Sequence, residues 1–204
     1  MFLFNEKKCA DICLKNTNKY VFKAVNDLIS DFERVSTFGV KPKIVKNVTQ
    51  NCIIIEENTR TSAEPVADES YSITTENGNI VIRADGYLGT MWGIYTLSEK
   101  FLDVDPCYLF NDLAIVKKNA VELSEVDIAD KPDGFGFRGV FINDEDLLQG
   151  WKDGGGARLV GGGYYYVTVA KTVIEKVVET VLRLKLNLVI PATFIDLDNP
   201  PEKD

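Results

Sequence analysis

Apolar residues along the first 130 positions alternate between the spacing of strands and the spacing of helices. A helix is predicted after Asn18, whose side chain can cap it, because the apolar residues that follow recur every three or four positions. These residues are Val21, Val25, Leu28, Ile29, Phe32 and Val35. A second helix is predicted on the same grounds from about Leu88 to Phe101, and Asp105-Pro106 is predicted to end it.

Short β-rich runs supply the predicted strands of this region. They are residues 2–4, 10–14, 44–45, 52–55, 71–74, 80–82, 113–116 and 120–123. Asn77-Gly78 separates two of these runs, and both residues tolerate the positive φ of a tight hairpin turn. Strands mixed with two helices predict an N-terminal two-layer α/β sandwich over residues 1–131. The polar stretch 130–134, which contains Pro132 and Gly134, is the predicted domain boundary.

The pattern changes beyond this boundary. A strand is predicted at residues 138–142, a helix from about Val167 to Lys185, and a second strand at residues 188–190, with a glycine-rich loop before the helix. This order is a βαβ unit of the kind that opens a (β/α) barrel, in which the carboxyl ends of the strands form the active face. A closed barrel needs about 250 residues. We therefore expect residues 132–204 to be the truncated start of a TIM-type catalytic barrel.

The sequence contains no histidine. Within these 204 residues, this excludes Ser-His-Asp and Cys-His nucleophiles and the two-histidine zinc helix of metalloproteases. With histidine chemistry excluded, catalysis by Asp or Glu carboxyl groups is the first candidate mechanism. No cofactor is expected. The four cysteines, Cys9, Cys13, Cys52 and Cys107, lack metal-ligand spacing, so no metal site is expected either. We interpret them as reduced core thiols, while a disulfide between two of them stays open.

The net charge of −8 and the lack of a basic run argue against nucleic acid as a partner. A membrane partner is not expected, because the sequence has no run of about 18 apolar residues. The first residues, MFLFNEKK, do not form a charged n-region followed by an apolar h-region. The localisation stays open between a cytoplasmic protein and one whose signal peptide has been removed.

Several motifs resemble those of glycoside hydrolase family 115 and occur in the same order as in that family. Its members are α-glucuronidases that release (4-O-methyl)glucuronic acid from xylan. Residues 22–35 resemble the family's first helix, and residues 83–99 resemble its G-T-x-x-G-I-Y-x-L-S-E helix. Residues 137–146, FRGVFINDED, are the sharpest match, and residues 181–192 complete the set. Thr193-Phe194 stands where the family has Met-Trp or Met-His, which leaves the exact sugar open.

Asn143-Asp144-Glu145-Asp146 is the candidate catalytic segment. Glycoside hydrolysis uses two carboxyl groups on either side of the scissile bond, and clustered acids raise one another's pKa toward the range of a general acid. The residue pattern alone fits the N-terminal cap of a helix equally well. The resemblance implies that Glu145 is catalytic, and that Asn143 and Asp144 bind the sugar.

Trp151 and Arg158 are further candidate substrate-binding residues. Trp151 can stack on a sugar ring, and Arg158 or Lys152 can pair with a uronate carboxylate. Packing of a loop by Trp151 and ordinary surface charge at the two cations are the alternatives. The glycine-rich segment 154–163 lacks the Lys-Ser/Thr of a phosphate-binding loop and is interpreted as a loop over the barrel mouth.

The resemblance implies an inverting hydrolase that acts on a glucuronoxylan-type polysaccharide or oligosaccharide. Its second carboxylate would come from later strands, so we expect this polypeptide to be inactive alone. The alternative is a non-catalytic carbohydrate-binding or assembly module. Exposed apolar strands at Val140–Ile142 and Val189–Ile190 would pair edge to edge, which predicts a homo-oligomer. Relatives in the family are often secreted or periplasmic.

Overall fold

The computed structural model describes residues 1–58, 69–131, 135–142, 148, 151 and 169–190, and the backbone of residues 157–161 and 164–168. The chain divides into two compact units, Met1–Gly136 and Phe137–Asp204. Helices and strands are mixed within both units, which confirms the expected α/β class.

The first unit is built on a six-stranded sheet of order β3-β2-β4-β6-β5-β8. Its strands are β2 (Asp11–Lys15), β3 (Ile44–Val45), β4 (Cys52–Asn58), β5 (Tyr71–Glu76), β6 (Asn79–Asp85) and β8 (Asp127–Asp130). Strands β3, β2, β4 and β6 run parallel, and β5 pairs antiparallel with β6 and β8. A separate antiparallel pair joins β1 (Phe2–Phe4) to β7 (Val121–Glu122).

The turn between β5 and β6 has the conformation that its sequence predicts. Asn77 has a φ of 50° and Gly78 a φ of 75°, and Glu76 faces Asn79 across the turn. Two consecutive residues with positive φ match the right-handed twist of the strands that they join. The predicted hairpin at Asn77-Gly78 is therefore confirmed.

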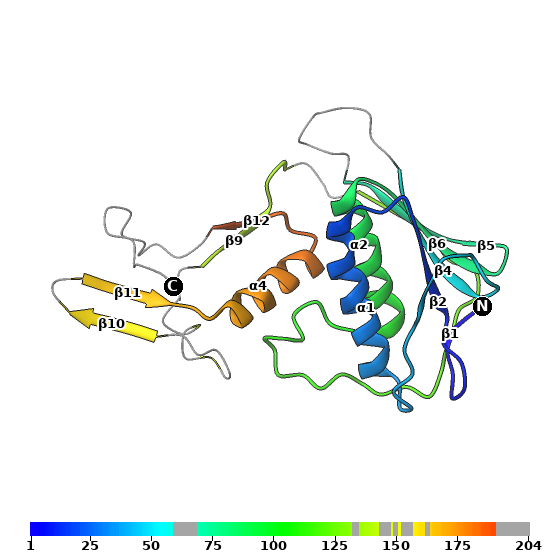
Figure 1. Cartoon of the computed structure of the whole chain (residues 1–204), viewed down its shortest axis with the longest axis horizontal. Helices are drawn as coiled ribbons and strands as arrows, with labels where there is room; N and C mark the ends of the chain where they lie inside the picture. Colours follow the sequence, from blue (N-terminus) through cyan, green and yellow to red (C-terminus); the bar gives the residue numbers. More distant parts are fainter. Residues whose placement is uncertain are drawn as a thin grey trace. The chain divides into compact units, whose positions relative to one another are not determined.

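Two helices lie side by side over one face of this sheet, as Figure 1 shows. The first is α1 (Phe22–Val35), preceded by a 3-10 turn, η1 (Lys19–Val21), whose first exposed amide groups are capped by Asn18. The second is α2 (Tyr87–Leu97), which continues as a π-helical turn, η2 (Ser98–Leu102). Side chains of the central strands that are fully buried include Ile12, Ile53 and Ile82.

Helix α2 is buried on all sides, whereas a single buried stripe was expected. Every residue from Gly89 to Leu97 is buried, including Trp92 and Tyr95. Two glycines let the helix approach the sheet closely. A Cβ on Gly89 would lie 2.7 Å from the carbonyl oxygen of Ser70, and one on Gly93 would lie 2.7 Å from a methyl group of Ile82.

One expectation for the end of the first unit is wrong, and one strand there was not predicted. The predicted strand at 113–116 is not a strand, and Leu113 and Val116 are 65% and 66% exposed. Strand β8, which closes the sheet beside β5, was not predicted. The second helix ends before Asp105-Pro106, because Asp103 already adopts a left-handed conformation with a φ of 56°.

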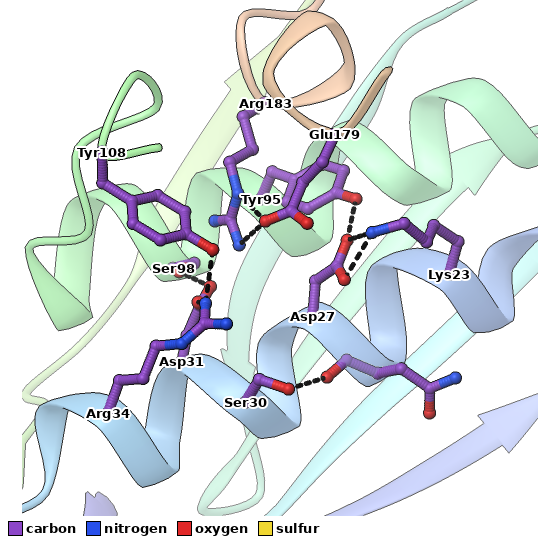
Figure 2. A network of polar contacts seen from close by, with 11 residues as sticks. Lys23, Asp27, Ser30, Asp31, Arg34, Tyr95, Ser98, Tyr108, Glu179 and Arg183 are labelled. Atoms are coloured by element: carbon purple, nitrogen blue, oxygen red, sulfur yellow. Dashed lines mark hydrogen bonds and ion pairs between the residues drawn. The ribbon is translucent and has the colours of Figure 1, made fainter. Parts of the chain in front are cut away.

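A network of polar contacts joins α1 to α2 and η2 (Figure 2). Asp31 of α1 is fully buried, and its carboxyl oxygens accept hydrogen bonds from Ser98 Oγ at 2.6 Å and Arg34 Nη1 at 3.4 Å. One turn earlier, Asp27 accepts a hydrogen bond of 2.6 Å from the Tyr95 hydroxyl. The packing of these two helices here depends on satisfying a carboxyl group in the interior.

The opposite face of the sheet is apolar at one end and ionic at the other. Cys13, Cys52, Ile54 and Val81 form a buried cluster on it. All four cysteines are free thiols, and burial together with the nearby Asp11 raises the pKa of Cys9 to about 12. Farther along, Arg83 pairs with both Glu56 and Glu76.

Replacement of Ser98 by alanine tests the buried carboxyl group. Ser98→Ala leaves one oxygen of Asp31 without this donor, which is expected to cost about 1–3 kcal/mol of unfolding free energy. Thermal unfolding measures it as a Tm lowered by about 3–10 °C. Ser30→Ala is the matched control, because Ser30 is half-buried and its hydroxyl donates to the Asn26 carbonyl of its own helix, not to a buried carboxyl group. A change within about 0.5 kcal/mol is expected for the control, and equal effects of the two variants would contradict this account.

The Glu76 carboxyl group is expected to titrate with a pKa of about 2. Hydrogen bonds from Arg83, and then from Thr74, lower this pKa from an ordinary value near 4.5. A folded pKa below the unfolded one stabilises the fold above about pH 4.5, and this contribution is lost as the pH falls toward 2. Carbon-detected NMR titration measures the pKa directly. In Arg83→Met it should return toward 4.5, and an ordinary pKa in the unsubstituted protein would refute the pairing.

Candidate active site

The second unit contains two parallel strands joined through a helix. Strand β9 (Gly139–Phe141) pairs with β12 (Leu188–Ile190) in the register Gly139 to Leu188, Val140 to Val189 and Phe141 to Ile190. Helix α4 (Lys171–Arg183) lies between them in the chain. The predicted βαβ order and the neighbouring positions of Val140 and Val189 are confirmed. That these strands open a barrel stays a prediction.

An apolar cluster holds α4 against the two strands. Ile142, Val177 and Val181 are its buried residues. Val140, Leu148, Ile174, Leu186 and Val189 pack around them. The residues of α4 in this cluster recur every three or four positions, so one face of the helix is apolar and packs on the strands.

Helix α4 ends in a Schellman motif that directs the chain into β12. Lys185 has a φ of 59°, its amide donates to the Leu182 carbonyl at 3.1 Å, and the Leu186 amide donates to the Val181 carbonyl at 2.9 Å. These bonds satisfy the last carbonyl groups of the helix. The same turn brings Leu186 into the apolar cluster, so β12 starts at a defined position beside β9.

Hydrogen bonds fix the register of the two strands at both ends. At the amino end, the Leu188 amide donates to the Arg138 carbonyl at 3.0 Å, and the Arg138 amide donates to the Asn187 side chain at 2.8 Å. At the carboxyl end, the Ile142 amide donates to the Ile190 carbonyl at 2.9 Å. The backbones approach so closely at Gly139 that an added Cβ would lie 2.1 Å from the Leu188 oxygen.

The principal candidate residues follow directly from the carboxyl end of β9. Asn143, Asp144 and Glu145 come immediately after Ile142 in the sequence, and they lie outside the residues that the structure describes. Ile142 before them and Leu148 after them both pack into the apolar cluster around α4. The chain on either side of the three candidates is therefore anchored to the same core, at the end of a strand where barrel enzymes carry their catalytic residues.

The other candidates lie farther along the chain. The ring of Trp151 lies beneath the ammonium group of Lys176 on α4, 4.9 Å from ring centre to nitrogen, so a cation already covers part of one of its faces. Arg158 lies in β10 (Ala157–Gly161), which pairs antiparallel with β11 (Tyr164–Thr168). Its side chain, and Lys152, are outside the described part.

The strands β10 and β11 correct two sequence predictions. The segment from 154 to 163 was expected to be an irregular loop, and the helix after it was expected to start near Val167. Instead the backbone forms a hairpin in which Leu159 pairs with Tyr166, and α4 begins at Lys171. The tyrosines at 164–166 have high β propensity, which outweighs the glycines around them.

Among the described residues, no three side chains of Cys, Asp or Glu are grouped so that they could hold a metal ion. Within the same residues, no helix combines the length and apolarity needed to cross a bilayer.

Residues 130–203 match the family model described as Glycosyl hydrolase family 115. This segment contains β9, α4 and β12 and the three candidates that follow β9. The C-terminal part of the chain resembles family 115. The resemblance inferred from the sequence motifs is confirmed over these residues. No curated protein matches the chain in sequence.

A solved family 115 enzyme shares the fold. It is BtGH115A, a 4-O-methyl-α-glucuronidase described as specific for decorated arabinogalactans, and it matches 90% of this chain with a TM-score of 0.67 and 21% identity. The chain spans 25% of the length of that enzyme. Weaker matches include the chitobiase of Flavobacterium johnsoniae, with 20% identity over 72% of this chain and 21% of that one and a TM-score of 0.47.

Replacement of Gly139 by alanine tests the register on which the site depends. The Cβ of Gly139→Ala would collide with the Leu188 carbonyl, a backbone atom that cannot rotate away, so β9 and β12 should separate. We expect a loss of about 2–3 kcal/mol. Hydrogen exchange should show at least about tenfold less protection at the Ile142 and Leu188 amides. Gly136→Ala is the control, since nothing lies within 4 Å of its added Cβ, and undiminished protection in Gly139→Ala would contradict the register.

Proposed function

We propose that this chain carries the N-terminal α/β domain and the first βαβ unit of the catalytic barrel of a family 115 glycoside hydrolase. The parallel pairing of β9 and β12 carries the proposal, because residues 143–145 follow β9 in the sequence and the carboxyl ends of parallel strands form the active face of a (β/α) barrel. The family match over residues 130–203 supports it. The proposed domains are residues 1–131 and 132–204.

Glu145 is the proposed catalytic carboxyl group. An inverting glycosidase uses one protonated carboxyl group and one carboxylate, about 6.5–9.5 Å apart, with a water molecule between the second group and the sugar. Asn143 and Asp144 are proposed to hydrogen-bond the sugar hydroxyls from the same segment. Arg158 would pair with the uronate carboxylate, and Trp151 would stack on a sugar ring.

The 204-residue chain is proposed to be inactive alone. Its segment after β9 would supply one of the two catalytic carboxyl groups, and the other would come from another barrel strand. The surface of the second unit agrees with a need for further strands. Phe141 and Ile190, in β9 and β12, are 49% and 47% exposed. Further barrel strands would cover such residues, and self-association of the chain is the other way to cover them.

The proposed substrate is a polysaccharide that bears (4-O-methyl)glucuronic acid. The solved enzyme of similar fold is described as specific for decorated arabinogalactans, whereas the sequence motifs resemble enzymes that act on xylan. The group that both kinds of polymer present is the α-linked uronate. A glucuronoxylan-type chain is the substrate proposed here.

The proposal is tested with methyl 4-O-methyl-α-glucuronide and the 204-residue chain. We expect weak binding, with a Kd on the order of 1–10 mM, because only part of the sugar site is present. NMR should show shifts at the amides of Ile142 and Ile190. Glu145→Ala should weaken binding about fivefold or more. Release of glucuronic acid from glucuronoxylan should not exceed that of the buffer.

Glu175→Ala is the matched control, because Glu175 is an exposed residue of α4 whose ion pair among the described residues is with Lys171 on the same helix. It should leave the glucuronide shifts unchanged. Equal effects of the two variants, or no shifts at Ile142 and Ile190, would contradict a sugar site at the end of β9. Turnover near 1 s⁻¹, a typical enzymatic rate, would contradict the proposed inactivity.

A further inference from the structure

A groove of about 750 Å³ opens in the first unit at the amino ends of the parallel strands. Cys9, Asn51 and Gly78, which precede β2, β4 and β6, are among the residues that line it. This is the end of the sheet opposite to the one where α1 and α2 begin, because each of these helices follows the carboxyl end of a strand. Nothing in the proposed chemistry at β9 uses this groove.

Four lysines line the groove, together with a single acidic residue. They are Lys7, Lys8, Lys41 and Lys43, and the acid is Asp11. The whole chain has 31 acidic and 23 basic residues, so a surface with a local excess of positive charge stands out from the rest of the protein. Such a local excess attracts anionic ligands to a protein whose net charge repels them.

Among the described residues, three of these lysines have no acidic partner. Lys41 pairs with the exposed Glu33 at 3.3 Å. In the part of the chain that the structure describes, Lys7, Lys8 and Lys43 form no ion pair, although acidic residues are more numerous than basic ones. Their ammonium groups therefore remain available to a ligand.

The backbone holds these lysines in place around the groove. The amides of Lys7 and Lys8 both donate to Asn5 Oδ1 at 3.0 Å, which fixes the turn between β1 and β2. The carbonyl of Lys43 accepts a hydrogen bond of 2.8 Å from Ile12, at the edge of the sheet. Two distant segments thus present their lysines to one groove without further rearrangement of the chain.

Carboxamide groups add neutral donors to the same surface. Gln50 and Asn51 line the groove, and Asn51 Oδ1 accepts the Phe2 amide at 2.9 Å, which orients this side chain. Lysines act as compact point charges, and each can pair with a single anionic group such as a carboxylate. The groove combines point charges for carboxylates with amides for hydroxyl groups.

We propose that this groove binds a segment of a uronate-bearing polysaccharide, apart from the catalytic end of β9. Lys7, Lys8 and Lys43 would pair with uronate carboxylates, and Gln50 and Asn51 would hydrogen-bond sugar hydroxyls. The identity of the polymer rests on the proposed function. The groove would hold the polysaccharide on the first unit, as an auxiliary binding site.

The test measures the affinity of the full 204-residue chain for a glucuronoxylan oligosaccharide by calorimetry. Lys8→Gln/Lys43→Gln should bind about tenfold more weakly, as two lost ion pairs would cause. Lys15→Gln/Lys46→Gln is the matched control, because it removes the same charge from exposed lysines at the other end of β2 and β3. The control should bind within about twofold of the unsubstituted chain. The same oligosaccharide with its carboxyl groups reduced to alcohols should also bind about tenfold more weakly.

Three results would overturn the proposal. They are equal losses in the two double variants, equal binding of the carboxyl-reduced oligosaccharide, and equally tight binding of single-stranded DNA, which would indicate a surface that binds any polyanion. If Lys8→Gln/Lys43→Gln loses affinity for the oligosaccharide as expected, while no glucuronide shifts occur at Ile142 and Ile190, the groove is supported and the proposed catalytic site is not.

Discussion

The close approach of β9 and β12 is the constraint on which the second unit depends. The Leu188 carbonyl occupies the space that any side chain at position 139 would need, so the parallel pair can form only with glycine there. The pair in turn gives α4 a surface on which to pack. In the sequence, the acidic segment begins two residues after the end of β9.

The first unit depends on a similarly close backbone approach, that of the buried helix α2 to the sheet. Helix α2 has no solvent-exposed face between Gly89 and Leu97, so its glycines face the sheet and its polar groups need internal partners. Asp31 and Ser98 supply one such pair of partners at the contact with α1. The helices and the sheet leave the amino ends of the strands uncovered, and this is where the lysine groove opens. The two proposed carbohydrate sites therefore belong to separate units and arise from different parts of their folds.

Much of the fold was predictable because its signals are local. The spacing of Val25, Leu28 and Phe32 predicts α1, and Asn77-Gly78 predicts the hairpin. The run at 113–116 has the composition of a strand, but it lies in no sheet and Leu113 is exposed. Composition alone does not supply a partner strand. The pairing of β10 with β11 was missed because the glycines of this segment indicate a loop, although its tyrosines favour a strand.

The two proposed sites also differ in how far the sequence predicts them. The segment Asn143–Glu145 was proposed from a resemblance to a family and from its place after a predicted strand. The lysine groove has no linear signature, since Lys8 and Lys43 come together only when β3 pairs with β2. Such a cluster can be recognised only after the strands are paired.

The most direct test of the central claim is a crystal structure of the chain with 4-O-methylglucuronic acid bound. The account predicts the sugar beside the carboxyl ends of β9 and β12, with the Glu145 carboxyl group within hydrogen-bonding distance of it. A structure in which Glu145 points into solvent, and the sugar lies elsewhere or not at all on the second unit, would contradict the account.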